Sequence, residues 1–206
     1  MRPIQIITTS FPIADGNYLA LAQTPTGAGF LTLVESSIVP PRFVTITSAG
    51  NDTARTFTIV GVGPNNEPQT ETLAGSNASS STSTKTFSYV ESIYVDAATA
   101  GAVEAGVTQS GYSQWIPLDI YTPNQVTTIS ASVSGTVNYS IEYTNEDPFD
   151  HSFVHQAVAH PAAGGAFTSA TTSQTHFTTT LMRAVRYKIN SGSGSIRLTI
   201  TQQSTA

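Results

Sequence analysis

The sequence contains no cysteine and few charged residues. Its 206 residues include 8 Lys and Arg and 13 Asp and Glu, so charged residues make up 10% of the chain and the net charge is −5. A chain without cysteine cannot form disulfides, thiolate zinc sites or a cysteine nucleophile. Basic residues this sparse and dispersed do not form the patch that phosphate binding requires, so we expect no specific nucleic-acid partner.

Long hydrophobic runs are also missing. No run approaches the roughly 20 apolar residues that a membrane helix needs. Residues 1–7, Met-Arg-Pro-Ile-Gln-Ile-Ile, lack the long apolar region and the small-residue cleavage site of a signal peptide. We therefore expect no membrane partner and a protein that is made in a cytoplasm without export by a signal peptide.

The residues that are abundant favour strands. Ser, Thr, Asn, Gln and Gly must cover most of the surface, and β-branched Thr fits a pleated sheet better than a helix. A chain of 206 residues can form one large or two small domains, each with a buried core. We predict an all-β fold, an antiparallel β-sandwich or jelly-roll-like arrangement in two β domains.

Residues 183–201 carry the clearest strand pattern in the chain. Apolar residues alternate with polar ones in two runs: Val185, Tyr187 and Ile189, then Ile196, Leu198 and Ile200. Ser191-Gly-Ser-Gly194 lies between the runs and tolerates positive φ, so we predict a β-hairpin here. The same pattern in residues 126–133 and 137–143 predicts a second hairpin, with its turn at Gly135.

We divide the chain into an N-terminal arm at 1–35, a first β domain at 36–110 and a second β-sandwich domain at 111–206. The arm contains Pro12, Asp15-Gly16 and Pro25, which break any long element. Its apolar residues lack regular strand spacing, and we predict that they contact another subunit: Ile4, Ile6, Ile7 and Phe11. The alternative is that the arm is an ordinary first strand and loop of the first domain.

Strands with short turns fill the two domains. In the first, we expect strands at 43–47, 56–62, 70–74 and 86–95, with turns at 49–52 and 63–68 and a Ser/Thr-rich loop or exposed edge at 76–84. In the second, a long connection at 145–170 precedes a strand at 175–181.

The only concentration of residues that could bind a metal lies in that long connection: Asp147, Asp150, His151, His155 and His160. His151 and His155 would share a face if a helical turn formed, but Pro161 ends any helix and no HExxH pattern occurs. We interpret the segment as a solvated loop and predict no metal and no cofactor. His176 stands alone at the start of a strand, where we expect a position in the pleat or on the surface.

Catalytic patterns are absent from the sequence. It contains no GxSxG elbow, no phosphate-binding loop and no suggestive pair of carboxylates, so we predict that the protein is not an enzyme. Trp115, Tyr112 and Tyr121 could form a platform that stacks on sugars. Because Ile116 and Leu118 follow Trp115, we interpret this tryptophan as a core anchor.

Four segments resemble small structural proteins of tailed bacteriophages: residues 113–119, 133–143, 147–150 and 185–198. Segments 43–52, 70–75 and 83–90 are similar to β-rich phage modules, so the resemblance spans most of residues 40–202. It implies a non-enzymatic virion structural protein and brings no active-site residues. It implies first a capsid decoration, or cement, protein that stabilises the head by bridging capsid subunits, and second a head-to-tail connector or tail component.

On this resemblance the expected partners are the major capsid protein and copies of the chain itself. The expected location is the virion, assembled in the host cytoplasm. A low-charge, β-rich, cysteine-free chain suits repeated copies that bury sheet edges on their neighbours. A carbohydrate-binding β-sandwich module is a further alternative with the same composition.

Overall fold

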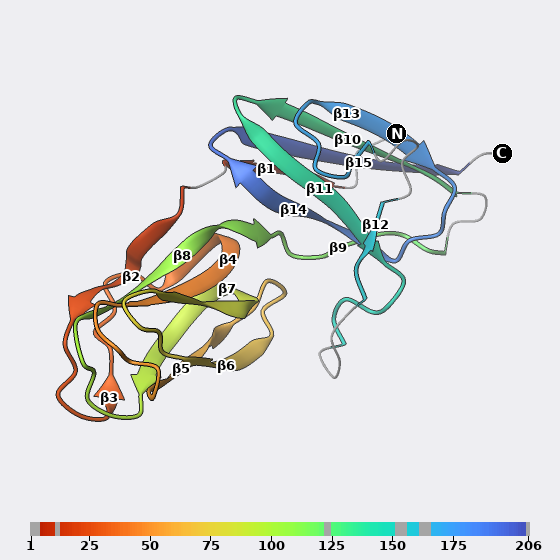
Figure 1. The fold of residues 1–206 in the computed structure, drawn as a ribbon. Coiled ribbons are helices and arrows are strands. Elements are labelled where there is room, and N and C mark those ends of the chain that lie inside the picture. The colour runs from red at the N-terminus through yellow and green to blue at the C-terminus, as the bar shows by residue number, and fades with distance from the viewer. Residues whose placement is uncertain (1–4, 11–12, 122–124, 151–155, 161–165, 205–206) are drawn as a thin grey trace. The chain divides into compact units, whose positions relative to one another are not determined.

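The computed structural model describes residues 5–10, 13–121, 125–150, 156–160 and 166–204, which form strands and connections (Figure 1). The predicted all-β, antiparallel fold is confirmed, because the sheets are antiparallel and the described residues contain no helix. It follows that none of them forms a helix long and apolar enough to cross a membrane. The chain forms two compact units: the terminal unit, Met1–Pro12 with Tyr112–Ala206, and the inserted unit, Ile13–Gly111.

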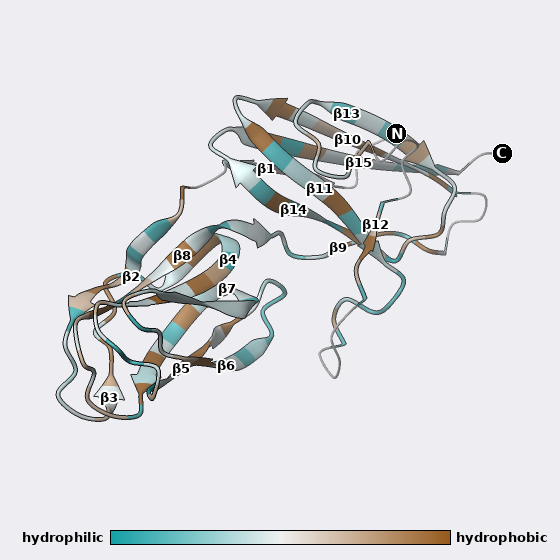
Figure 2. Ribbon diagram, viewed as in Figure 1, coloured by the Kyte–Doolittle hydropathy of each residue, from teal (hydrophilic) through white to brown (hydrophobic). Residues whose placement is uncertain are grey.

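The terminal unit contains two sheets. The first has the order β1-β15-β10-β13 and consists of β1 (Gln5–Ser10), β10 (Gln125–Ser134), β13 (Gln174–Thr178) and β15 (Ser195–Ser204). The second has the order β12-β11-β14-β9 and consists of β9 (Ile116–Pro117), β11 (Val137–Thr144), β12 (Val158–Ala159) and β14 (Ala184–Gly192). Alternate apolar side chains of both sheets share one core, and Figure 2 shows this alternation along the strands. The terminal unit is therefore a two-sheet β-sandwich.

The two hairpins predicted in this unit are wrong. β14 pairs with β11 and β9, whereas β15 pairs with β1 and β10, so the two strands lie in different sheets. β10 and β11 are divided between the two sheets in the same way. Each short connection therefore crosses from one sheet to the other. A period-two pattern fixes which face of a strand is buried, but it does not fix which strand is the partner.

Glycine is needed at these two connections because they approach each other closely. The amides of Ser193 and Gly194 both donate to the carbonyl of Thr136, at 2.9 and 2.7 Å. Gly135 has φ 78°, and a Cβ on Gly194 would lie 2.3 Å from the carbonyl oxygen of Ser134. A larger residue at either position would push the two crossing connections apart.

The inserted unit has the sheet order β6-β5-β7-β4-β8, with β2 on β8 and β3 on β7. Its strands are β2 (Asp15–Gln23), β3 (Gly29–Phe30), β4 (Ser37–Ser48), β5 (Thr56–Val62), β6 (Pro68–Ala74), β7 (Ser80–Val95) and β8 (Val103–Tyr112). A separate core fills this unit, with Phe57, Ile59 and Phe87 fully buried. The predicted turn at 63–68 joins β5 and β6 as a hairpin, closed by a bond from Gly63 N to Glu67 O.

The Ser/Thr-rich tract differs in part from the expected loop or edge. Ser80, Ser81 and Thr82 begin β7 and pair with β4. On the other side, the carboxylate of Glu71 in β6 accepts bonds from the amides of Thr84 and Lys85, at 2.6 and 2.9 Å. These acceptors satisfy amides that would otherwise face solvent, so a polar tract can continue as a strand.

The N-terminal residues also differ from the expected arm. Within 1–35, β1 belongs to the first sheet of the terminal unit, and β2 and β3 belong to the inserted unit. Ile6 and Ile7 pair with Thr199 and Leu198 of the same chain. Ile4 and Phe11 lie outside the described residues, so contact of these four side chains with another subunit stays a prediction.

Candidate binding surface

Three aromatic side chains stand exposed on one sheet surface of the inserted unit. Phe30 of β3 is 70% exposed, and Tyr89 and Tyr94 of β7 are 45% and 36% exposed. The Phe30 and Tyr94 rings meet edge to face with their centroids 5.3 Å apart. We call this surface, with Val60 and Val62 of β5, the aromatic face.

Strand register brings these side chains together. Tyr94 pairs with Phe30 on one side and Thr58 on the other, and Tyr89 pairs with Val62. Tyr94 follows Tyr89 by five positions, a spacing that would put them on opposite faces of a regular strand. A β-bulge in β7, opposite Val60 and Gly61, adds one residue and returns both rings to the face away from the core.

The aromatic face offers mainly apolar contact area, and the acidic residues beside it are Glu35 and the exposed Glu91, which lies in β7 between Tyr89 and Tyr94. Its members are Phe and Tyr rings and Val side chains, and the paired residues Thr58 and Ser37 are polar but uncharged. Glu35 precedes Ser37, and its carboxylate accepts bonds from the amides of Ser36 and Ser37, at 2.8 and 3.0 Å. The Ser37 bond, followed by the Ser36 bond, lowers the pKa of Glu35. Exposed aromatic rings with apolar neighbours are typical of surfaces that bury area on a partner.

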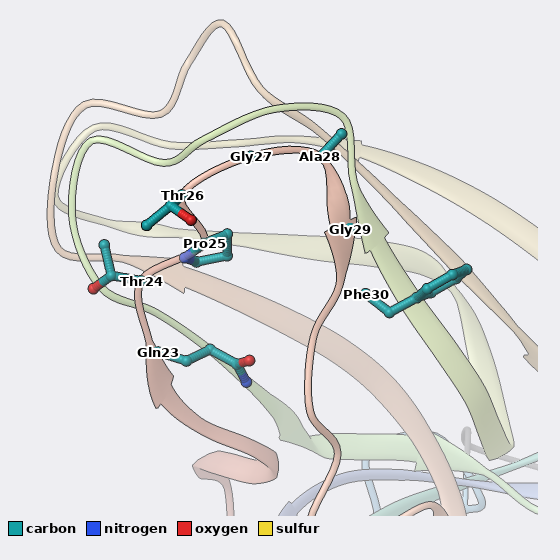
Figure 3. A pocket seen from close by; sticks show the side chains of 8 residues that line it. All are labelled: Gln23, Thr24, Pro25, Thr26, Gly27, Ala28, Gly29 and Phe30. Carbon is teal, nitrogen blue, oxygen red and sulfur yellow. The ribbon is translucent and has the colours of Figure 1, made fainter.

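A shallow depression of about 340 Å³ lies in the loop that leads to Phe30 (Figure 3). Its lining residues carry no titratable side chain: Gln23, Thr24, Pro25, Thr26, Gly27, Ala28, Gly29 and Phe30. The Gln23 amide closes the neck of the loop, because Oε1 accepts from Thr32 N at 2.9 Å and Nε2 donates to Thr32 O at 3.1 Å. The loop positions Phe30, whose ring points away from Pro25 and Thr26 in Figure 3.

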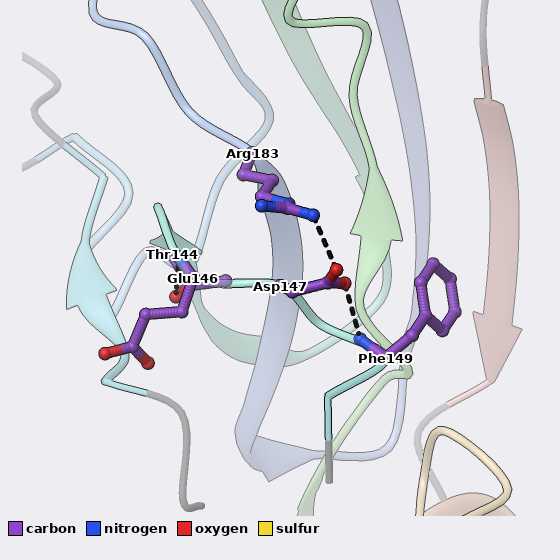
Figure 4. Close-up of polar contacts among 5 residues, drawn as sticks. All are labelled: Thr144, Glu146, Asp147, Phe149 and Arg183. Atoms are coloured by element: carbon purple, nitrogen blue, oxygen red, sulfur yellow. Dashed lines mark hydrogen bonds and ion pairs between the residues drawn. The ribbon is translucent and has the colours of Figure 1, made fainter. Parts of the chain in front are cut away.

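Asp147 and Asp150, the acidic residues of the long connection that could bind a metal, form hydrogen bonds within the turn at 147–150. Asp147 Oδ2 accepts a hydrogen bond from Arg183 Nη2 at 2.6 Å, and Asp147 Oδ1 accepts from the amide of Phe149 at 3.0 Å (Figure 4). The amide of Asp150 donates to the carbonyl of Asp147. Asp147 thus ties the turn at 147–150 to the residue before β14.

The histidines of the long connection are only partly described. His151 and His155 lie outside the described residues, so the shared face expected for them stays a prediction. His160 is 3% exposed, and its ring lies 5.2 Å from Phe167 and 5.4 Å from His176, centroid to centroid. The solvated loop expected here is therefore wrong at His160, because hydrogen bonds to β11 hold the backbone and place the ring inside the unit.

His176 lies in β13. A position in the pleat of a strand was one of the two alternatives expected for it. Among the described residues, no group of three or more His, Cys, Asp or Glu side chains could hold a metal ion. The pair formed by His160 and His176 was missed in the sequence, because sixteen positions separate the two residues and their proximity depends on the pairing of β12 and β13 with different sheets.

The aromatic residues that could have stacked on sugars have different environments. Trp115 is 4% exposed, which agrees with its interpretation as a core anchor. The side chain that lies over its ring is the charged Arg186. The guanidinium carbon of Arg186 lies 4.4 Å from the Trp115 ring centroid and 4.0 Å from that of Tyr112. Tyr121 is 90% exposed and does not share this stack.

Comparison with known proteins adds no relatives. No protein-family model, curated protein or solved structure matches the chain.

Proposed function

We propose that this protein is a non-enzymatic structural protein of a tailed-phage virion. In this proposal it decorates the head and stabilises it by binding the assembled shell, with the major capsid protein and copies of itself as partners. The aromatic face of the inserted unit carries the proposal, because it combines exposed Phe30, Tyr89 and Tyr94 with apolar neighbours. The resemblance of residues 40–202 to phage structural proteins sets the context.

The strand order of the terminal unit also supports a virion protein. Numbered along the chain, its first, eighth, third and sixth strands form one sheet, and its second, seventh, fourth and fifth form the other. We interpret this order as a jelly roll, an architecture found in viral capsid proteins and in lectins. A fold does not fix a function, so sugar binding remains the competing function for this unit.

Low charge indicates how the protein would attach. With 10% charged residues, the chain has few ion pairs to offer a partner, so apolar contact and hydrogen bonds must supply most of the affinity. A protein that attaches in this way bridges neighbouring shell subunits. It favours the assembled shell because it binds the assembled state alone.

Deleting the coding sequence from the encoding phage tests the proposal. The deleted particles should release their DNA at a lower temperature than wild-type particles, while tails and adsorption to cells remain normal. Particles that hold DNA normally but fail to join tails would instead indicate a head-to-tail connector. Particles that fail only to adsorb would indicate a tail component or a glycan-binding module.

A further inference from the structure

Two short segments cover the outer edge of β11 in the terminal unit. Val158 and Ala159 pair with Tyr143 and Glu142, and the amide of His160 donates to the carbonyl of Ile141 at 2.9 Å. Further along the chain, the carbonyls of Phe167 and Ala170 accept bonds from the amides of Ile141 and Tyr139, both at 2.9 Å. Both segments lie between β11 and β13 along the chain, and together they cover this edge of the sandwich.

The ring of His160 lies where these segments meet β13. It contacts the Phe167 ring edge to face and the His176 ring edge to face. Both ring nitrogens are buried, and neither has a hydrogen-bond partner. A neutral imidazole already loses free energy in this position, because its N–H and its lone pair both lack partners.

We propose that His160 is an acid-sensitive latch, and that protonating its ring releases residues 156–160 and 166–170 from the edge of β11. The latch is a separate property from head decoration. It rests on the geometry of the buried His160 ring between Phe167 and His176.

The charges around His160 determine the direction of the effect. Residues 158–160 and 166–170 offer no other titratable side chain, and β13 offers His176. On β11, Tyr139 donates its hydroxyl to Thr172 O, and Glu142 is bonded to Arg186 at 2.8 Å. Tyr143 is the third titratable residue of this strand. A protonated His160 therefore gains no free carboxylate and lies beside a second imidazole.

Release is expected to follow acidification. Burial, and to a smaller extent His176, lowers the pKa of His160 to about 4 from its ordinary value of 6.5. In the open state the ring regains its ordinary pKa, so the open state binds the proton more strongly. The opening equilibrium should then rise by about 70-fold between about pH 8 and about pH 4.5.

Hydrogen exchange read by NMR tests the latch on the full chain. The amides of Tyr139, Ile141 and Ala170 report it, and amides of the β10–β15 ladder serve as references, with intrinsic exchange rates corrected for pH. Wild-type protein should lose protection at the three reporter amides at about pH 4.5 while the reference amides stay protected. Equal behaviour of both sets would overturn the proposal.

Substitution of His160 separates its titration from general acid effects. His160→Phe keeps a ring against Phe167 and removes the proton, so its reporter amides should stay protected at low pH. His160→Leu makes the same test if the larger ring does not fit. His176→Gln is the matched control, because it keeps the buried His160 and should retain acid release. If His160→Phe or His160→Leu opens as readily as wild type, His160 is not the latch.

Discussion

The guanidinium of Arg186 lies over the indole of Trp115, with 4.4 Å between its central carbon and the ring centroid. Arg186 also stacks on Tyr112 and forms an ion pair with Glu142 in which both side chains are less than one-fifth exposed. The segment from Tyr112 to Trp115 is thereby fixed to the side of β14 that faces away from the core. Trp115, which we expect to be a core anchor, is buried, and a cation lies over its ring.

Arg186→Ala should destabilise the terminal unit by about 2–3 kcal/mol. The change removes two cation–π contacts and leaves Glu142 partly buried without its cation. Trp115 is the single tryptophan, so its fluorescence should shift to the red as the indole becomes exposed. Lys188→Ala is the matched control, because Lys188 Nζ lies 5.7 Å from the Tyr112 ring centroid, and we expect little change. An unshifted emission spectrum in Arg186→Ala would contradict the stack.

Asp52→Ala should destabilise the inserted unit by about 2 kcal/mol, because it removes the buried side-chain acceptor of the Ala100 amide. Asp52 is fully buried, and its Oδ1 accepts from the amide of Ala100 at 2.6 Å. This bond ties the turn after β4 to the turn before β8. Urea unfolding measures the loss, with exposed Asp96→Ala as the control. An equal effect of both substitutions would mean that the Asp52 bond carries no stability.

Alkaline pH should weaken the terminal unit through Tyr139. Burial raises the pKa of Tyr139 to about 12, so the folded state holds this proton more strongly than the unfolded state does. Its stabilising contribution is complete below the ordinary pKa of 10 and falls as pH rises towards 12, by about 2 kcal/mol. Tyr139→Phe should lower the free energy of unfolding at neutral pH, because the bond to Thr172 O is lost, and should reduce this alkaline slope. An unchanged slope would exclude Tyr139 as its source.

The inserted unit should fold alone when residues 13–111 are expressed. It has its own core, in which Phe57, Ile59, Phe87 and Ile93 are fully buried, and its strands pair among themselves. Deleting residues 1–10 from the full chain should destabilise the terminal unit, which loses β1, and leave the inserted unit unchanged. Circular dichroism measures the strand content of the 13–111 fragment and of the deletion variant, and urea unfolding measures their stability. An unfolded 13–111 fragment would refute the independence of this unit.

Sequence patterns predicted strands better than partners. The alternation in 185–189 and 196–200 correctly places Val185, Tyr187, Ile196 and Leu198 in the core. The same alternation is compatible with a hairpin or with a crossing between two sheets, because both bury one face of each strand. Selecting between them requires long-range pairing with β11 and β10, and local spacing does not contain that information.

The candidate binding surface was not predicted, for a different reason. Tyr89 and Tyr94 are five residues apart, so simple alternation assigns one of them to the core. The bulge in β7 opposite Val60 and Gly61 reverses this assignment. A usable signal was present in the apolar residues Phe87, Val90 and Ile93, whose three-residue spacing is wrong for a regular strand and indicates irregularity.

One boundary between the two units could be placed from the sequence, and the assignment of the N-terminal residues could not. We placed the start of the second domain at residue 111, and the compact units change between Gly111 and Tyr112. The N-terminal residues were harder to assign, because β1 pairs with β15, which lies at the other end of the sequence. Residues 1–35 therefore contribute to both units, a distribution that composition does not reveal.

Binding of purified protein to phage particles that lack it tests the central claim most directly. The wild-type protein should bind the heads saturably, and raising the salt from about 0.1 M to about 1 M should weaken binding little, because the contact is apolar. Phe30→Ser with Tyr94→Ser should weaken binding at least about tenfold. Tyr121→Ser, which removes an exposed tyrosine outside the aromatic face, should bind as wild type does. Wild-type affinity in the Phe30 and Tyr94 double variant, with its fold intact, would contradict the account.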